Sequence, residues 1–393
     1  MTINSLRPVL HEHLAWWGLR HVTSDHDYFD WQRQQLSPEE LTQLTSLAER
    51  KRAGDCLDEI AFYDRTASSR IYPVLYSQRY EYYEEVGRRV CAAIGSANTV
   101  LDFGCGLGVL TTFYARQFPE KNFVGLDRSP GSIAVAQKKA EALRLDNLRF
   151  ECMDAERDAL PGLYDLVIAT HVLMQAEQDP GVPSRSWQTF ERGHDLSQQT
   201  SFEQRTGLGK RLDRVCEVLG PNGRMIVSEK TRQLARRVPF QRALSSRGFR
   251  LVRPASDIHY RSIEEAVDDG PFYVLQRGLR EASSWDEGPE PDTSPPFDQD
   301  MTLPIHDPEG PLYENHRPSG QRVWEELRDR AVVEETTRQE SDGRQVHVER
   351  GTSDNFSYLY CANTFDQRQV VIVERARSTM IDAYYQEIIR GLP

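Results

Sequence analysis

Short apolar runs alternate with amphipathic stretches through the middle of the chain, from Thr99 to about Gln276. Apolar runs of strand length predict β-strands, and the stretches between the first runs have helical spacing. The predicted strands are 99–103, 122–126, 148–152, 166–170, 224–228, 249–252 and 272–276, with helices at 110–116 and 133–143. This alternation is typical of an α/β fold with a seven-stranded, mostly parallel sheet flanked by helices.

The segment before this region predicts helices rather than strands. Ser37 can cap a helix, Pro38 suits its first turn, and Glu40 completes a capping box. A second helical stretch, 78–94, leads directly into the first strand. We therefore predict an N-terminal helical cap or lid over residues 1–95 and an α/β domain over 96–283.

The last part of the chain changes character twice. A linker is predicted over 284–319, where Pro, Asp and Glu are frequent and no periodicity is visible. Residues 320–393 predict a small α+β domain, with a helix at 321–330, strands at 331–338, 345–350, 356–361 and 369–374, and a final helix at 378–390. Hairpin edges in this domain make a homodimer an expectation.

Composition narrows the class of protein. With 393 residues, of which 38% are hydrophobic, the chain can bury one large core and a smaller one. A formal net charge of -12 argues against a nucleic-acid partner. No apolar run has the length of a membrane helix, and residues 1–20 do not resemble a signal peptide, so we expect a cytoplasmic protein without a membrane partner. The six cysteines are spread singly and are predicted to be reduced.

Candidate chemistry concentrates in residues 100–108, where a buried strand ends at Asp102 and glycine then occupies every second position. Glycine in such a loop lets the backbone approach a ligand closely. The Gly-Lys-Ser/Thr ending of a phosphate-binding loop is absent. Val109 stands where a nicotinamide-binding loop would have its third glycine, which disfavours a dinucleotide.

Asp102-x-Gly104-x-Gly106-x-Gly108 resembles motif I of the class I, Rossmann-like S-adenosylmethionine (SAM) dependent methyltransferases. The resemblance implies SAM as cofactor and S-adenosylhomocysteine as product, with Asp102 near the amino group. Asp127, which ends the next strand, would bind the ribose hydroxyls, and Asp154 would accept from the adenine amine. The implied cofactor residues are Asp102, Gly104, Cys105, Gly106, Gly108, Asp127, Arg128, Asp154, Ala155 and Thr170.

The acceptor is less well defined by the sequence. His171 follows the fourth strand and is a candidate base or acceptor ligand. A tyrosine-rich segment supplies candidate pocket residues, namely Tyr63, Tyr72, Tyr76 and Tyr80, although core packing is the competing explanation for each of them. Methyl transfer needs mainly alignment and exclusion of water, so a catalytic signature is not required.

Several acceptor classes are disfavoured. Residues 169–172 lack the Asn/Asp-Pro-Pro-aromatic tetrapeptide of amino-nucleobase methyltransferases, and no carboxylate cluster suggests a catechol-type magnesium site. His11 and His13 lack further ligands, so no metal is predicted. The leading hypothesis is methylation of an oxygen, nitrogen or carbon atom of a small metabolite, such as a specialised natural product. A protein or peptide methyltransferase and a non-catalytic SAM-binding regulator are the alternatives.

Overall fold

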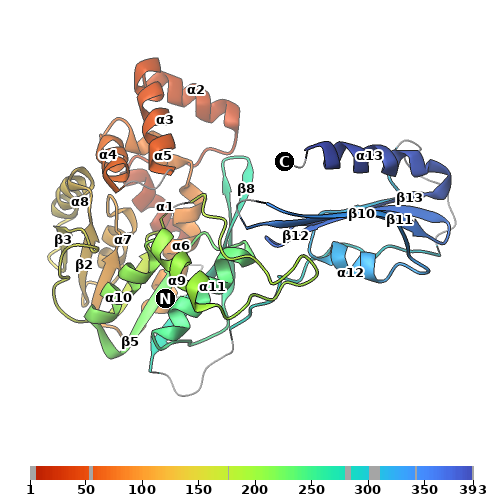
Figure 1. Ribbon diagram of the computed structural model, residues 1–393. Coiled ribbons are helices and arrows are strands. Elements are labelled where there is room, and N and C mark those ends of the chain that lie inside the picture. Colours follow the sequence, from red (N-terminus) through yellow and green to blue (C-terminus); the bar gives the residue numbers. More distant parts are fainter. Residues whose placement is uncertain are drawn as a thin grey trace. The chain divides into compact units, whose positions relative to one another are not determined.

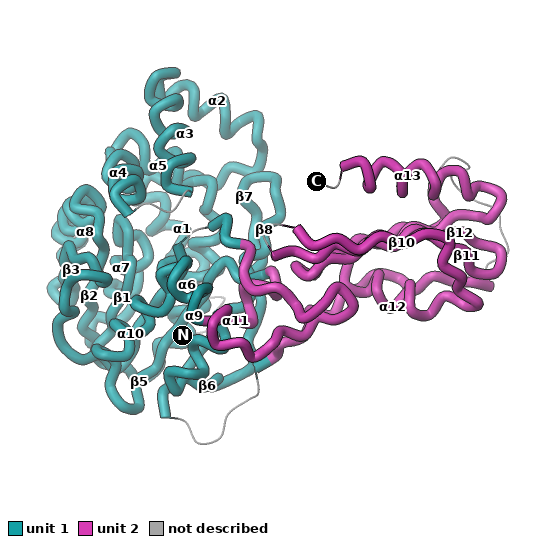
Figure 2. The backbone as a smooth tube through the Cα atoms, viewed as in Figure 1, with its two compact units in different colours: residues 1–179, 200–232, 240–285 teal, residues 180–199, 233–239, 286–393 magenta. Residues whose placement is uncertain are grey.

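The computed structural model describes residues 6–52, 56–175, 177–278, 285–300, 310–340 and 343–391. The chain divides into two compact units (Figure 2): residues 1–179, 200–232 and 240–285 form the first, and residues 180–199, 233–239 and 286–393 form the second. This division differs from the predicted boundaries, because two segments inside the α/β region belong to the second unit.

The first unit is built on one sheet, whose strands follow the order β3-β2-β1-β4-β5-β8-β6. Its strands are β1 (Thr99–Phe103), β2 (Asn122–Asp127), β3 (Leu148–Cys152), β4 (Tyr164–Thr170), β5 (Leu219–Ser228), β6 (Phe249–Leu251) and β8 (Glu265–Arg277). β1 to β5 pair in parallel, whereas β8 is antiparallel to β5 and β6. The predicted mostly parallel sheet is confirmed.

An eighth strand, β7 (Ser256–Ser262), pairs with β8 and was not predicted. Only Ile258 in this strand is fully buried, and its neighbours are polar or charged. A strand with one buried position lacks the apolar run on which the prediction of the other strands depended.

Helices cover the sheet and fix the positions of the strand ends (Figure 1). α7 (Val109–Gln117) packs on β2, α8 (Pro130–Ala142) packs on β2 and β3, and α10 (Leu208–Val218) packs on β5. The remaining helices of this region are α9 (Leu196–Arg205) and α11 (Leu234–Ser246). In β1 and β2, Asp102 lies opposite Gly125 and Phe103 opposite Leu126. Asp102, the last but one residue of β1, and Asp127, the last residue of β2, therefore lie at the same edge of the sheet.

The N-terminal region is helical, as predicted. Its helices are α1 (Leu6–Trp16), α2 (Asp25–Gln35), α3 (Pro38–Arg52), α4 (Cys56–Thr66), α5 (Tyr72–Ser77) and α6 (Tyr80–Ile94). The predicted capping box is confirmed: the Glu40 amide donates to Ser37 Oγ at 3.2 Å, and the Ser37 amide donates to Glu40 Oε2 at 2.9 Å. α1 packs on α6 and α7, which joins these helices to the α/β core.

Replacing the cap, Ser37→Ala, is expected to destabilise α3 by about 1 kcal/mol, because the Glu40 amide loses its acceptor. Thermal unfolding should show a lower midpoint than for the wild type. Thr42→Ala is the matched control, because the Thr42 hydroxyl donates to the Pro38 carbonyl inside the same helix and caps no amide. An equal effect of both substitutions would contradict the role of the capping box.

The second unit contains a five-stranded antiparallel sheet in the order β10-β11-β12-β13-β9. The elements are β9 (Tyr313–Asn315), α12 (Ser319–Glu325), β10 (Ala331–Gln339), β11 (Gln345–Ser353), β12 (Phe356–Asn363), β13 (Arg368–Glu374), the 3₁₀ turn Arg375–Arg377 and α13 (Ser378–Gly391). α12 and α13 lie on opposite faces of this sheet (Figure 1). The predicted linker therefore contributes a strand, β9, and its residues 301–309 lie outside the described residues.

Two other predictions concern residues spread along the chain. All six cysteines lie within the described residues and are free thiols. Among the described helices, none combines the length and the apolar character that a membrane span needs.

Candidate active site

A pocket opens at the carboxyl ends of the parallel strands in the first unit. Nine of the ten predicted cofactor residues line it, namely Asp102, Gly104, Cys105, Gly106, Asp127, Arg128, Asp154, Ala155 and Thr170. The tenth, Gly108, caps α7 with φ 78°, and a Cβ there would lie 2.6 Å from Phe150 Cζ. Close packing under the loop, rather than the pocket, therefore requires glycine at position 108.

The glycine loop after β1 is held by close contacts on one side and is open on the other. Gly104 has φ +72°, and a Cβ there would lie 2.1 Å from Val172 Cγ2. Gly106 has φ +55°, and a Cβ there would meet nothing within 4 Å. The backbone at Gly106 therefore faces open space in the pocket, where a ligand can approach it.

These two glycines give different expected results when replaced. Gly104→Ala combines the left-handed backbone with a collision, so we expect a loss of roughly 3 kcal/mol of unfolding free energy. Gly106→Ala should lose only the roughly 1–2 kcal/mol of the backbone conformation. Chemical denaturation of both variants measures the difference, and equal losses would contradict the close contact between Gly104 and Val172.

Asp102 is a buried carboxylic acid that faces the pocket. It is 6% exposed, and its Oδ2 accepts from Thr111 Oγ1 at 2.5 Å. Burial raises the pKa of Asp102 to about 7, and the nearby Asp127 carboxylate contributes to the rise. The Tyr114 hydroxyl also lines this part of the pocket and, among the described residues, has no hydrogen-bond partner. A cationic group bound beside Asp102 would stabilise its ionised form.

Asp127 holds the glycine loop in place and still faces the pocket. Its Oδ2 accepts from the Gly106 amide at 2.9 Å, and its Oδ1 accepts from the Ser129 amide at 2.9 Å. Each carboxylate oxygen can accept a further hydrogen bond. Burial raises the pKa of Asp127, whereas these two amides counteract the rise. The carboxylate can therefore accept from two neighbouring hydroxyl groups of a ligand.

Asp154 lies in the pocket wall, but its carboxylate also organises its own turn. Oδ1 accepts from the Glu156 amide at 3.0 Å, and Oδ2 lies 3.4 Å from Arg157 Nε. This is the capping arrangement that competes with a ligand role for an acidic residue that opens a turn. Glu156 continues the wall and pairs with Arg211 at 2.9 Å.

A charged group that the sequence did not reveal also lines the pocket. Arg79 precedes α6, lines the pocket and stacks over the Tyr82 ring, with its guanidinium carbon 4.0 Å from the ring centre. Its Nη2 donates to His171 Nδ1 at 2.7 Å. Among the described residues, no carboxylate forms an ion pair with Arg79. Its remaining donors are therefore available to an anionic group of a ligand.

His171 is held between Arg79 and Asp269. Because arginine only donates, His171 Nδ1 must accept, and the ring proton lies on Nε2, 3.2 Å from Asp269 Oδ2. Burial lowers the pKa of His171 to about 4, so the ring is neutral at physiological pH. Asp269 also accepts from the Tyr260 hydroxyl at 2.7 Å. The sequence predicts that His171 could act as a base. In this arrangement it can remove a proton only when the hydrogen bond from Arg79 to Nδ1 is broken.

The four candidate tyrosines separate into two pairs. Tyr63 and Tyr76 line the pocket. Tyr72 instead packs edge-on against Trp17, with ring centres 5.9 Å apart, and Tyr80 stacks on His21 at 5.0 Å. The structure does not bring Tyr72 and Tyr80 to the pocket, because both side chains belong to the core beneath the N-terminal helices.

α4, which carries Tyr63, is attached to the end of β2 by polar contacts. Arg128, directly after β2, forms an ion pair with Glu59 and donates to Cys56 Sγ at 3.1 Å. Asp64 accepts from the Ser129 hydroxyl at 2.6 Å. These contacts hold α4 against the end of β2, beside the pocket. Sequence reasoning missed Arg79 and Glu59, which line the pocket. Tyr82 and Tyr83, which belong to the same tyrosine-rich segment as Tyr76, line it as well.

The strand order and the glycine loop after β1 are those of a Rossmann-like α/β fold. Residues 94–253 match the family model described as "Methyltransferase domain". This region is therefore similar to methyltransferase domains, and the match covers 160 of the 393 residues. The first ninety residues and the second sheet lie outside the match.

Curated relatives match short parts of the chain. A tRNA (guanine-N(7)-)-methyltransferase of Rubrobacter xylanophilus is 36% identical over 87 residues, which cover 22% of this chain and 37% of the relative. A malonyl-[acyl-carrier protein] O-methyltransferase of Bacillus cereus is 33% identical over 70 residues, covering 18% of this chain and 25% of the relative. The chain thus spans well under half the length of these relatives.

Solved structures are similar at low identity. The O-methyltransferase region of StiE, residues 961–1257, has a TM-score of 0.37 and 17% identity, covering 52% of this chain and 77% of that one. Magnesium protoporphyrin IX methyltransferase (ChlM) from Synechocystis PCC 6803, solved with bound SAM, has a TM-score of 0.35 and 20% identity, covering 52% and 81%.

Proposed function

We propose that this protein is a SAM-dependent methyltransferase that methylates an oxygen, nitrogen or carbon atom of a small metabolite, such as a specialised natural product. One observation carries the proposal: Asp102, Asp127 and the open side of Gly106 line the same pocket as Arg79 and several tyrosines. Function in open α/β sheets concentrates at this edge of the strands.

The chemistry of the pocket fits the parts of SAM. Asp102, whose ionised form has no cationic partner among the described residues, would bind the ammonium group. Asp127 would accept from both ribose hydroxyls, and the backbone at Gly106 would lie against the ligand. Arg79 would bind the carboxylate of the methionine part. Asp154 and Ala155 would lie beside the adenine.

SAM, when bound, supplies a methyl group on a positively charged sulfur, which an acceptor can attack directly. The chain would mainly orient the two reactants and exclude water. Tyr63, Tyr76 and Tyr83 would form the wall on the acceptor side. His171 is held neutral between Arg79 and Asp269. It would act as a base, or bind the acceptor, only after the hydrogen bond from Arg79 to Nδ1 is broken.

The choice of a small acceptor rests on the chain itself. The net charge of -12 gives little attraction for phosphates, although one relative is named for tRNA. The O-methyltransferase named for malonyl-[acyl-carrier protein] is compatible with a small or carrier-bound acyl acceptor. The absence of a nucleic-acid partner therefore remains a prediction, as does a homodimer.

The test is transfer of a labelled methyl group. The intact protein, incubated with methyl-labelled SAM and a cell extract, should place the label in extractable small molecules, and Asp127→Ala should abolish the transfer. Label recovered in protein or in RNA would contradict a small-molecule acceptor and would identify a macromolecular one. SAM binding without transfer to any fraction would favour a non-catalytic regulator.

Light scattering on the full chain tests the homodimer. A mass of twice 45.2 kDa is expected, and a mass of 45.2 kDa at every concentration would contradict it. The exposed edge strand β10, where Val332 is 48% and Val333 57% exposed, supports the expectation.

A further inference from the structure

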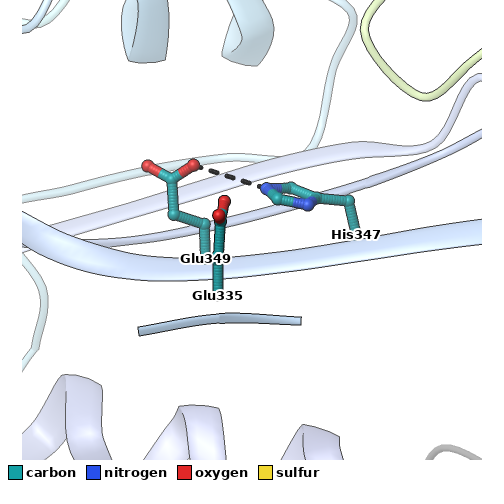
Figure 3. Close-up of side chains that lie close together, drawn as sticks. All are labelled: Glu335, His347 and Glu349. Carbon is teal, nitrogen blue, oxygen red and sulfur yellow. Dashed lines mark hydrogen bonds and ion pairs between the residues drawn. The ribbon is translucent and has the colours of Figure 1, made fainter. Parts of the chain in front are cut away.

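Three metal-ligating side chains converge on one face of the sheet in the second unit. Glu335 comes from β10, and His347 and Glu349 come from β11. One ligand atom from each lies within 4.8 Å of the other two, and Figure 3 shows all three side chains on the same side of the sheet. His347 is 1% exposed and Glu349 is 3% exposed, whereas Glu335 is exposed to solvent.

The His347 ring is fixed so that one nitrogen faces the carboxylates. Its Nδ1 lies 2.8 Å from Thr337 Oγ1, and the Trp187 ring stacks on it with centres 3.6 Å apart and an angle of 1° between the planes. A ligating histidine commonly uses its second nitrogen for a hydrogen bond of this kind, which sets the tautomer and the ring orientation. Nε2 is the atom that remains for a metal.

The Glu349 carboxylate is held in the same way through one oxygen. Its Oε1 accepts from Trp324 Nε1 at 3.1 Å and from the Tyr358 hydroxyl. Its other oxygen, Oε2, faces His347 Nε2 at 3.3 Å. His347 Nε2 and Glu349 Oε2 therefore face each other, and these are the two atoms that can ligate a metal.

The distance of 3.3 Å between Nε2 and Oε2 is long for a direct hydrogen bond and also matches the spacing of two metal ligands. A charge-assisted N–H···O bond is typically about 2.7–2.9 Å long. Two ligands that each lie about 2.0–2.1 Å from a tetrahedral zinc ion are about 3.3 Å apart. Moreover, Glu335 lies directly opposite Glu349 in the β10–β11 pairing, where like charges destabilise the sheet unless a cation lies between them.

We propose that Glu335, His347 and Glu349 bind one zinc ion. One nitrogen and two carboxylate oxygens are a donor set that zinc accepts, with water in the fourth position on the exposed side of Glu335. Calcium would need about six to eight oxygen ligands, and magnesium rarely takes a histidine. The ion would join the edge strand β10 to β11 and so stabilise the second unit. This site does not depend on the proposed methyltransferase activity.

Metal titration of the full-length, chelator-treated protein tests the site. Cobalt(II), a spectroscopic substitute for zinc, should bind with a stoichiometry of one and give the intense visible absorption of a tetrahedral complex. Zinc should displace it and raise the midpoint of thermal unfolding. His347→Ala should abolish stoichiometric binding. Glu335→Gln, at an exposed position where folding is not at risk, should weaken zinc binding roughly 10-fold or more.

His316→Ala is the matched control. His316 lies in the same unit, 2.8 Å from Glu314, and both side chains are exposed, but the pair has no third ligand among the described residues. Its replacement should leave the titration unchanged. Absence of stoichiometric cobalt binding by the wild type, or binding that survives both His347→Ala and Glu335→Gln, would overturn the proposal. Loss of SAM binding or of methyl transfer in another experiment would not affect it.

Discussion

Replacing Asp127 by alanine is expected to weaken SAM binding by about 100-fold or more. Two hydrogen bonds from ribose hydroxyls to a carboxylate contribute roughly 1.5 kcal/mol each at the least, and 1.4 kcal/mol corresponds to a factor of ten. The Gly106 amide would also lose its acceptor, which loosens the loop against which the ligand lies. Isothermal titration calorimetry with SAM and with S-adenosylhomocysteine measures the change.

Asp165→Ala is the matched control for this substitution. Asp165 Oδ2 accepts from the amides of Asn98 and Thr99 at 2.9 and 3.0 Å, at the opposite edge of the same sheet. Its replacement therefore removes a similar pair of backbone contacts without touching the pocket. Similar losses of affinity in both variants would mean that general destabilisation, not ligand contact, explains the effect of Asp127.

Asp102→Asn is expected to change binding and stability in opposite directions. Asparagine keeps the shape of the side chain and can still accept from Thr111, but it removes the charge that would bind the SAM ammonium group. We expect SAM affinity to fall by about 10-fold to 100-fold, since charged hydrogen bonds contribute roughly 1.5–3 kcal/mol. At pH 8 the variant should unfold at a higher temperature than the wild type, because it no longer buries an ionised carboxylate.

The direction of the expected stability change follows from the raised pKa of Asp102. The pKa of Asp102 is raised from 3.8 to about 7 in the folded protein, so the folded state binds more protons than the unfolded state between these values. The contribution of Asp102 to wild-type stability should therefore fall as pH rises from about 4 to 7, and the advantage of Asp102→Asn should grow over the same range and level off above it. Wild-type SAM affinity should decrease below pH 7, where binding must displace a proton. A variant that loses both stability and affinity at pH 8 would contradict this role of Asp102.

The sequence predicted the parts of the site that depend on strand ends. A carboxylate after an apolar strand must lie at the carboxyl edge of a parallel sheet, so Asp102 and Asp127 could be placed without coordinates. Gly104 and Gly106 followed from their spacing in the same loop. Gly108 shares that spacing, but its position under Phe150 depends on packing across β3, which spacing does not reveal.

The acceptor side could not be predicted in the same way. Arg79, His171 and Asp269 come from the start of α6, the end of β4 and the middle of β8, and only the sheet order brings them together. The tyrosines show the same limit. Tyr76 and Tyr80 are four residues apart, yet they lie in different helices, so helical spacing could not show which side chain faces the pocket.

The second unit shows how segments far apart in the sequence come together. Residues 180–199 form a polar interruption in the α/β region, and their apolar residues are too few to predict a partner. In the structure Trp187 stacks on His347, 160 residues further along the chain. The three proposed zinc ligands likewise depend on the β10–β11 register, which includes an irregularity between Val332 and Glu334.

The central claim is that the pocket beside β1, β2 and β4 binds SAM. A crystal structure of the intact protein with S-adenosylhomocysteine tests it most directly. We expect the ribose hydroxyls to contact Asp127, the ammonium group to lie beside Asp102 and the carboxylate to contact Arg79. A ligand bound elsewhere, or a pocket that stays filled by side chains at saturating ligand, would contradict it.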